Sequence, residues 1–257
     1  MSPAALPRIE ELQAPGAWRS IEFISDLHLQ VDEPQTFEAW RRYMAHPSAD
    51  AIFILGDLFD VWVGDDEAQQ PGFAADCAAV LLAAASHASI FFMHGNRDFL
   101  VGEDFIGACR ATLLPDPTVL AFAGKRWLLT HGDALCLADT KYMEFRAKVR
   151  TAKWQRDFLA QPLAQRQAIG RQLRQESEEF KREVAHYAEV DGPAAQAWLE
   201  QADAQVLIHG HTHRPADHVL ALGRQRMVLS DWDATAQPPR HEVLRLSRDG
   251  ARRIALP

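Results

Sequence analysis

The chain is poor in cysteine: only three occur among 257 residues, and none falls in a CxxC spacing. So few thiols, odd in number, argue against a disulfide framework and fit a reducing compartment. Long apolar runs are also missing, since the longest weakly polar run, residues 78–85, is far shorter than the roughly 20 residues of a membrane span. Residues 1–19 hold no apolar core of signal-peptide length and are expected to form a flexible leader. The sequence therefore predicts a cytoplasmic protein.

An overall excess of positive charge is missing too. The chain has 27 Lys and Arg against 35 Asp and Glu, for a formal net charge of −8. Such an acidic chain is a poor bulk binder of nucleic acid, and no nucleic-acid partner is expected. Residues 141–182 are the exception, with 11 basic and 5 acidic residues. On charge alone, a local anionic partner and a solvated helical face explain this basic segment equally well.

The order of apolar segments indicates an α/β fold. Up to residue 100, strands expected at 21–25, 51–55 and 89–93 alternate with helices expected at 35–45 and 74–87. This rhythm is typical of a parallel sheet with helical crossovers. Further along, pairs of apolar strands flank short turns at 123–124, 223–224 and 249–250, which predicts antiparallel hairpins. Both pairing types in one chain predict a two-sheet β-sandwich flanked by helices.

A long helical block, roughly 139–200, interrupts this pattern. Its apolar residues are interspersed with dense charge, and Pro162 is expected to break or kink it. The block lies between two segments that carry candidate metal ligands, so it must leave and re-enter near the same edge of the sheet. We interpret it as a helical lid inserted into a domain of residues 20–138 and 201–257. A plain packing bundle is the alternative.

Five separate apolar strands end on residue types that bind metal ions. These residues are Asp26, His28, Asp57, Asn96, His131, His211 and His213. The carboxyl ends of strands in α/β sheets form the rim where ligands bind, so we expect the seven side chains to meet there. Asp26 and His28 are two residues apart, and so are His211 and His213. This spacing puts both side chains of a pair on one side of an extended segment. The sequence therefore predicts a centre with enough ligands for two ions.

The types of ligand restrict the ion, and nearby glycines restrict the backbone. Oxygen and nitrogen donors without thiolate suit Mn²⁺, Fe²⁺, Co²⁺ or Zn²⁺ more than Ca²⁺, and they argue against a closed structural zinc site. Gly56, Gly95, Gly132 and Gly210 lie beside the candidate ligands. Glycine at such positions indicates a sharp turn or a close approach of the backbone to a ligand.

In this order the motifs D-x-H, GD, GN-x-D, H-G and GH-x-H resemble those of the calcineurin-like metallophosphoesterases, over residues 21–133 and 206–214. The resemblance implies a sandwich of two sheets with flanking helices and two divalent cations. It implies one ion held by Asp26, His28, Asp57 and His213, and a second held by Asp57, Asn96, His131 and His211.

Longer segments, among them LGDLFDVWVGDD, HGNRDFL and IHGHTHRP, resemble one branch of that family, the UDP-2,3-diacylglucosamine diphosphatases, over about residues 20–230. This resemblance implies hydrolysis of a pyrophosphate in lipid A biosynthesis, giving UMP and 2,3-diacylglucosamine 1-phosphate. It further implies Mn²⁺ as the usual ion and a peripheral position on the inner face of the inner membrane. Substrate contacts are implied for Asn96, Arg97, Asp139, Tyr142, Ser177, Lys181 and His211. Val184 departs from the branch, where a Lys is typical.

One further departure concerns the chemistry. Many members of the family read GNHD, whose His helps to protonate the leaving group, but here Arg97 stands between Asn96 and Asp98. An Arg stays charged and donates several hydrogen bonds to phosphate, yet it cannot shuttle a proton. We expect Arg97 and His211 to stabilise charge on the phosphoryl oxygens, and Asp98 to assist by orienting a neighbouring His or Arg.

Two other functions compete with hydrolysis of a UDP-linked diacylated glucosamine. One is another dinuclear-metal phosphoesterase that acts on a nucleotide, a phosphodiester or a phosphoprotein. The other is a catalytically dead scaffold, which the presence of all seven ligands disfavours. An anionic membrane surface is an expected partner of the basic lid, and the chain is expected to be a monomer.

Overall fold

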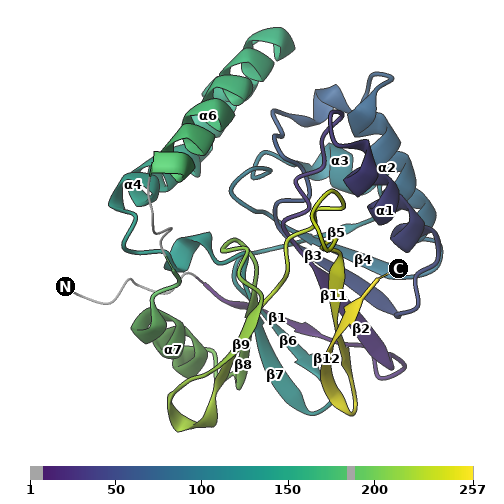
Figure 1. Cartoon of the computed structure of the whole chain (residues 1–257), viewed down its shortest axis with the longest axis vertical. Helices are drawn as coiled ribbons and strands as arrows, with labels where there is room; N and C mark the ends of the chain where they lie inside the picture. The colour runs from purple at the N-terminus through teal and green to yellow at the C-terminus, as the bar shows by residue number, and fades with distance from the viewer. Residues whose placement is uncertain (1–7, 184–188, 257) are drawn as a thin grey trace.

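The computed structural model describes residues 8–183 and 189–256, and for residues 177–183 it describes the backbone alone. Within these ranges the chain forms two six-stranded sheets with helices around them (Figure 1). The strand orders are β12-β11-β2-β3-β4-β5 and β1-β6-β7-β8-β10-β9. The predicted two-sheet sandwich flanked by helices is confirmed.

The first sheet has a parallel centre and an antiparallel edge. Its parallel strands are β2 (Ser20–Ile24), β3 (Ala51–Leu55), β4 (Ser89–Met93) and β5 (Thr112–Leu114). The crossovers contain α1 (Pro34–Ala45), α2 (Phe73–Ala84) and α3 (Glu103–Ala108), with a 3₁₀ turn η1 (Asp65–Glu67) before α2. The antiparallel edge is the hairpin β11 (Glu242–Ser247) and β12 (Gly250–Ala255). The strands and helices predicted in the first hundred residues are thus present, with ends shifted by up to three residues.

The second sheet is mixed. Its strands are β1 (Glu10–Gln13), β6 (Thr118–Phe122), β7 (Lys125–Leu129), β8 (Val206–His209), β9 (Ala216–Val219) and β10 (Gln225–Val228). Pairs β6–β7 and β9–β10 are the predicted hairpins, the second with a 3₁₀ turn η3 (Ala221–Gly223) between its strands. Strand β8 lies parallel to both β7 and β10.

The expected flexible leader over residues 1–19 is wrong for its second half. Residues 10–13 form β1 and pair in parallel with Thr118–Ala121. The strand has four residues, EELQ, of which only Leu12 is partly buried, so it carries no apolar alternation by which a strand is recognised. Residues 1–7 lie outside the described part of the chain.

Period-two alternation along the strands divides the core into layers. Phe23, Phe53 and Phe91 of the first sheet point toward the second sheet, where they meet residues such as Leu120 and Ile208. The Phe53 and Phe91 rings stack with centroids 4.5 Å apart. The alternate positions, such as Ile24, Ile54 and Phe92, pack against α1, α2 and α3. Burial on both faces holds the central strands rigid, so residues just past their ends have fixed starting points.

The helical block after β7 begins with a 3₁₀ turn η2 (Asp133–Leu135). It continues with α4 (Thr140–Val149), α5 (Ala152–Leu159), α6 (Leu163–Glu183) and α7 (Gly192–Gln201). The predicted break at Pro162 is confirmed, because α5 ends at Leu159 and α6 begins at Leu163. In Figure 1, α6 stands clear of the two sheets. None of the helices within the described ranges has the length and apolarity to cross a membrane.

The last helix of the block does not belong with the others. Trp198 and Leu199 of α7 are buried against Val119, Leu128 and Leu207 on the outer face of the second sheet. Helix α7 is therefore a layer of the sandwich, although the sequence places it in the inserted block of 139–200. We use the term lid for α4, α5 and α6, residues 140–183.

Candidate metal centre and the adjoining cavity

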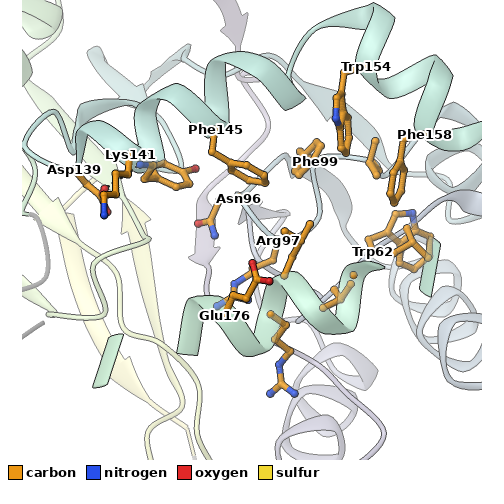
Figure 2. Close-up of a pocket in the computed structure, with 17 residues that line it drawn as sticks. Trp62, Asn96, Arg97, Phe99, Asp139, Lys141, Phe145, Trp154, Phe158 and Glu176 are labelled. Carbon is orange, nitrogen blue, oxygen red and sulfur yellow. Dashed lines mark hydrogen bonds between the residues drawn. The ribbon is translucent and has the colours of Figure 1, made fainter. Parts of the chain in front are cut away.

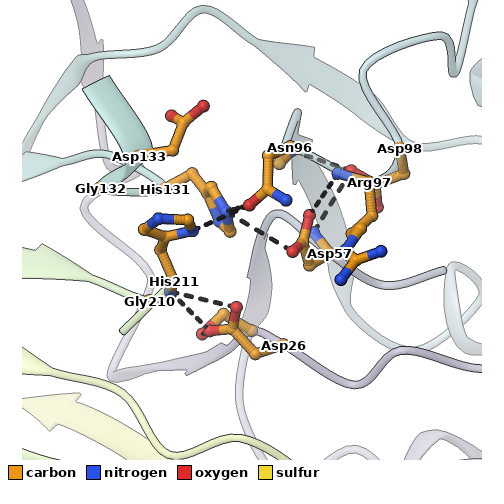
Figure 3. A network of polar contacts seen from close by, with 12 residues as sticks. Asp26, Asp57, Asn96, Arg97, Asp98, His131, Gly132, Asp133, Gly210 and His211 are labelled. Atoms are coloured by element: carbon orange, nitrogen blue, oxygen red, sulfur yellow. Dashed lines mark hydrogen bonds and ion pairs between the residues drawn. The ribbon is translucent and has the colours of Figure 1, made fainter. Parts of the chain in front are cut away.

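The structure brings all seven predicted ligands to one place, at the carboxyl ends of five strands. Asp26 and His28 follow β2, Asp57 follows β3, and Asn96 follows β4, while His131 follows β7. The last two, His211 and His213, follow β8. Figure 3 shows five of the seven converging from different strands.

One group of ligands consists of Asp26, His28 and His213. The Nε2 atoms of His28 and His213 face each other at 3.2 Å. His213 Nε2 lies 3.4 Å from Asp26 Oδ1, and His28 Nε2 lies 3.8 Å from Asp57 Oδ2. We call this group site A.

The other ligands form site B around Asn96. The Asn96 side-chain oxygen lies 2.9 Å from His131 Nε2 and 2.8 Å from His211 Nδ1. His131 Nε2 is also 3.7 Å from Asp57 Oδ2. The same Asp57 oxygen thus approaches a histidine of each site, as expected of a bridging ligand.

The chemistry of these atoms fits divalent cations. Two imidazole nitrogens at 3.2 Å cannot both carry a proton toward each other, so at least one lone pair faces the other ring. Asp26 and Asp57 are buried carboxylates, which proteins tolerate only with a counter-charge or hydrogen bonds. Oxygen and imidazole donors without thiolate match ions of the Mn²⁺ to Zn²⁺ series. Sites A and B would therefore hold the two ions, with Asp57 between them.

The protonation states of the cation-free protein also indicate that positive charge is needed among these ligands. Burial opposes charge on His131, but the carboxylates of Asp57 and Asp26 raise its pKa to about 9. Burial also opposes ionisation of Asp26, yet its hydrogen bond and Coulombic attraction to His213 hold the pKa of Asp26 well below the ordinary value. Protonated imidazole thus supplies the positive charge that a cation would supply, and cation binding would release protons.

The backbone at the paired ligands differs from the extended form that the spacing suggested. Asp26 and His28 have φ angles of 55° and 47°, and His211 and His213 have 69° and 52°. Asp57 also lies in the left-handed region, at 54°. This region is sparsely populated by residues other than glycine and costs free energy that the surrounding fold must supply. Asp26, His28 and His213 still face site A, and His211 faces site B. They do so through tight turns past the strand ends.

The predicted need for glycine beside the ligands is confirmed. A Cβ at Gly95 would lie 2.1 Å from Asp57 Oδ1, and a Cβ at Gly210 would lie 2.3 Å from Asp26 Oδ2. Neither glycine has a positive φ, so close approach is the reason for glycine at both positions.

Comparison with known proteins agrees with this geometry. A family model described as calcineurin-like phosphoesterase matches residues 20–215. The chain belongs to the calcineurin-like phosphoesterase family. The fold and the metallophosphoesterase chemistry predicted from the motifs are thereby confirmed.

Several relatives have a more specific name. A UDP-2,3-diacylglucosamine hydrolase of Bordetella pertussis is 43% identical over 235 residues, 88% of this chain and 91% of the relative. Proteins of the same name from Aromatoleum aromaticum and Xanthomonas axonopodis pv. citri are 45% and 42% identical, covering 82% and 89% of this chain and 88% and 96% of their own lengths. A solved archaeal phosphodiesterase is 13% identical with a TM-score of 0.47, over 92% of this chain and 99% of its own.

Beside the candidate metal centre of this phosphoesterase lies a cavity of about 370 Å³ between the lid and the sandwich (Figure 2). Asn96 and Arg97 line it from the sandwich, and Asp139, Lys141 and Tyr142 line it at the start of the lid. Most of the remaining lining is apolar, contributed by Val61, Trp62, Val63, Phe99, Leu100, Phe145, Trp154, Phe158 and Leu173. The predicted contact residues Ser177 and Lys181 lie on α6, but their side chains are outside the described part of the chain.

Arg97 and Asp98 have different surroundings. Arg97 donates its backbone N–H to Asp57 Oδ1 at 2.8 Å, and among described residues no carboxylate lies within ion-pair distance of its guanidinium. The Asp98 carboxylate is fully buried and accepts the backbone N–H groups of Gly95 and Leu58, each at 2.8 Å. The structure therefore ties Asp98 to the loops that carry Asp57 and Asn96, whereas the sequence led us to expect a neighbouring His or Arg side chain.

Tyr142 connects the lid to site B. Its hydroxyl donates to Asp133 Oδ2 at 2.5 Å, and its ring stacks on that of His211 with centroids 6.0 Å apart. Arg146 donates to the same carboxylate oxygen at 2.8 Å. Burial opposes ionisation of Asp133, but Arg146 and Arg150 hold its pKa far below the ordinary value. Asp133 thus anchors α4 to the sandwich.

Three features of the site were missed by sequence reasoning. Asp60 and Asp231 approach the site A histidines, and Arg174 of the lid pairs with Asp60. Asp60 and Asp231 each lie three or more residues past a strand end, among other acidic residues. No motif distinguishes them there from the acidic residues of a solvent-exposed loop. Their burial, 7% and 8% exposed, distinguishes them only in the folded chain.

Proposed function

We propose that this phosphoesterase hydrolyses the pyrophosphate bond of UDP-2,3-diacylglucosamine in lipid A biosynthesis, releasing UMP and 2,3-diacylglucosamine 1-phosphate. The observation that carries the proposal is the cavity, which combines Asn96, Arg97 and charged residues of the lid with a lining that is otherwise mostly apolar. A diphosphate linked to an acylated sugar has the same division into an anionic and an apolar part. The names of relatives at 42% to 45% identity support the same substrate.

At the polar end, the seven ligands would hold two divalent cations, which we propose to be Mn²⁺. Bound there, the ions would neutralise phosphoryl oxygens and lower the pKa of a nucleophilic water. Arg97 adds a fixed positive charge with several donors, and its backbone bond to Asp57 sets its position relative to site B. Asn96 lines the cavity beside Arg97, and its side-chain oxygen lies 2.8 Å from His211 Nδ1.

Elsewhere in the cavity, the lid and the loops of the sandwich together supply the apolar surface that acyl chains need. Phe145 and Leu173 line the cavity and are also 37% exposed each, so they are not committed to the protein core. Each methylene that leaves water contributes about 0.8 kcal/mol. The aromatic wall formed by Trp62, Phe99 and Phe158 can therefore contribute several kcal/mol to the affinity for a diacylated sugar over an unacylated one.

The assay compares three substrates with Mn²⁺ present: UDP-2,3-diacylglucosamine, UDP-N-acetylglucosamine and bis(p-nitrophenyl) phosphate. We expect efficient hydrolysis of the diacylated substrate alone. Leu173→Asp should raise KM for that substrate, while Leu82→Asp, at an exposed leucine of α2, should leave it unchanged. Turnover of the generic diester with none of the UDP-linked lipid would favour a phosphoesterase of another specificity.

We also propose that the cytoplasmic enzyme docks peripherally on the anionic inner face of the inner membrane through its lid. Exposed bases on α4 and α5 include Lys148, Lys153 and Arg156, and Leu159 is 41% exposed beside them. Each basic residue near an anionic surface contributes about 1 kcal/mol. Replacing the three bases by Gln should weaken cosedimentation with phosphatidylglycerol vesicles and leave cosedimentation with phosphatidylcholine vesicles unchanged. Equal partitioning of both proteins to anionic vesicles would contradict lid docking.

A further inference from the structure

The two histidines of site A have matching surroundings on the side that faces away from the cation position. While their Nε2 atoms face each other, His28 Nδ1 lies 3.9 Å from Asp60 Oδ1 and His213 Nδ1 lies 3.8 Å from Asp231 Oδ2. Both distances exceed a hydrogen bond, so the contacts shown are electrostatic. Both carboxylates are largely shielded from water, which strengthens such contacts.

An arginine stands behind each carboxylate. Arg240 donates to Asp231 Oδ1 at 3.0 Å through Nε and to Oδ2 at 2.8 Å through Nη2, a bidentate pair. Arg174 of α6 forms an ion pair with Asp60 Oδ2. Two series of His–Asp–Arg contacts therefore converge on site A from different elements, and one of them begins in the lid.

We propose that Asp60 and Asp231 are positioning residues for the cation of site A, and that Arg174 makes the lid part of that support. The inference rests on the metal centre of the proposed function. A cation at site A needs a lone pair on Nε2 of both histidines, so both ring protons must reside on Nδ1, where the two carboxylates stabilise them. A carboxylate behind a histidine ligand fixes its tautomer and ring orientation, and its loss typically costs about 10- to 100-fold in metal affinity.

The contacts from His28 through Asp60 to Arg174 have a consequence that the contacts from His213 through Asp231 to Arg240 lack. Arg174 also lines the cavity, next to Leu173 on α6. A molecule in the cavity that displaces Arg174 changes the support of His28, and by linkage the cation at site A changes the affinity for that molecule by the same factor. Substrate recognition by the lid and cation binding at site A are then coupled through the ion pair between Arg174 and Asp60.

The test is a titration of the metal-free protein with Mn²⁺, followed by electron paramagnetic resonance of the free ion. We expect Asp60→Asn and Asp231→Asn each to weaken one of two Mn²⁺ sites by about 10- to 100-fold. Arg174→Gln should weaken the same site by a smaller factor, and Asp60→Glu, which keeps the charge, should restore most of the affinity lost in Asp60→Asn.

The matched control is Asp66→Asn. Asp66 forms another ion pair between α6 and the β3–α2 loop, with Arg166, but it contacts no histidine in the described structure. The Asp66→Asn variant should therefore bind both Mn²⁺ ions as the unmodified protein does. An equal loss in Asp66→Asn would assign the effect to loosening of the lid and would overturn the inference, and so would unchanged affinity in both Asp60→Asn and Asp231→Asn.

The thermal unfolding midpoint of each metal-free variant distinguishes lost positioning from lost fold. A variant that unfolds at the unmodified temperature yet binds one Mn²⁺ more weakly supports the proposal. Turnover of UDP-2,3-diacylglucosamine by the unmodified protein tests the proposed function separately. If that turnover is present while the Asp variants keep full Mn²⁺ affinity, only the inference fails, whereas an unmodified protein that binds no Mn²⁺ contradicts the metal centre itself.

Discussion

Gly210→Ala provides a direct test of the packing that places Asp26. The backbone at Gly210 is not in the left-handed region, so alanine introduces no strain of φ there. Its Cβ would lie 2.3 Å from Asp26 Oδ2, 2.4 Å from Ser25 Oγ and 2.8 Å from Ser25 Cβ. All three separations are shorter than any ordinary contact, so either the Asp26 carboxylate or the 210–213 loop must move.

The size of that movement sets the expected effect. Carbon reaches its optimum contact at about 3.5 Å, so Asp26 Oδ2 must withdraw by roughly 1 Å. The withdrawal breaks the hydrogen bonds that Asp26 accepts from His211 N at 2.9 Å and from Ser25 Oγ at 2.6 Å. Overpacking of this kind costs about 1–3 kcal/mol of stability. A misplacement of about 1 Å at a reacting centre can cost about 100-fold in rate.

Mn²⁺ affinity of the metal-free protein and kcat/KM on the diacylated substrate are the two measurements. We expect both to fall by at least tenfold in Gly210→Ala. Gly107→Ala on α3 is the control, because a Cβ there meets nothing within 4 Å. Alanine in that helix should leave activity unchanged and raise stability by about 0.5–1 kcal/mol. Unmodified Mn²⁺ affinity in Gly210→Ala would refute the idea that close approach of the backbone places Asp26.

Three further predictions follow from the site and the core. Arg97→Gln should lower kcat/KM about 100-fold, because the charge that stabilises the phosphoryl oxygens is lost. Mn²⁺ affinity should stay unchanged, because the backbone hydrogen bond to Asp57 remains. Equal kinetics of the variant and the unmodified protein would show that Arg97 does not act on the phosphate. Burial and the neighbouring Glu22 raise the pKa of Tyr43, so above pH about 10 the unfolded chain releases a proton that the fold retains, and the free energy of unfolding falls as pH rises. Tyr43→Phe should reduce that fall in urea titrations at pH 9 to 11. Removal of cations by EDTA should lower the unfolding temperature, and Mn²⁺ at 100 times its Kd should add about 2.7 kcal/mol per site; a midpoint independent of Mn²⁺ would contradict two specific sites.

The metal ligands were predictable because each follows an apolar strand of the sandwich. A strand such as AIFIL is recognised by composition, and parallel pairing brings its carboxyl end to the common rim, so Asp57 could be placed without coordinates. The left-handed backbone of Asp26 and His28 could not be placed in this way. It depends on the hydrogen bonds that the Leu27 and His28 amides donate to the carbonyl oxygen of Asp57, across two strands.

Other parts of the chain carried no local signal. Strand β1 is short and polar and is fixed by pairing with β6, and α7 has the same helical pattern as the lid but packs on the second sheet. Asp60 and Asp231 belong to the site only because the fold buries them beside histidines that are distant in sequence. Partners of this kind are determined by tertiary packing, which single-sequence patterns do not contain.

The division between sandwich and lid assigns different parts of the reaction to different parts of the chain. Strand ends of the sandwich supply every candidate ligand, whereas the lid adds Phe145, Trp154, Phe158 and Leu173 to the apolar wall of the cavity. Among the polar contacts that join the parts, one lies beside each cation site: Tyr142 to Asp133 beside His211, and Arg174 to Asp60 beside His28. The lid cannot move as a body without changing the surroundings of both sites. Selection of the acyl chains and alignment of the phosphate should therefore occur together, so variants that loosen the lid should lower kcat as well as raise KM.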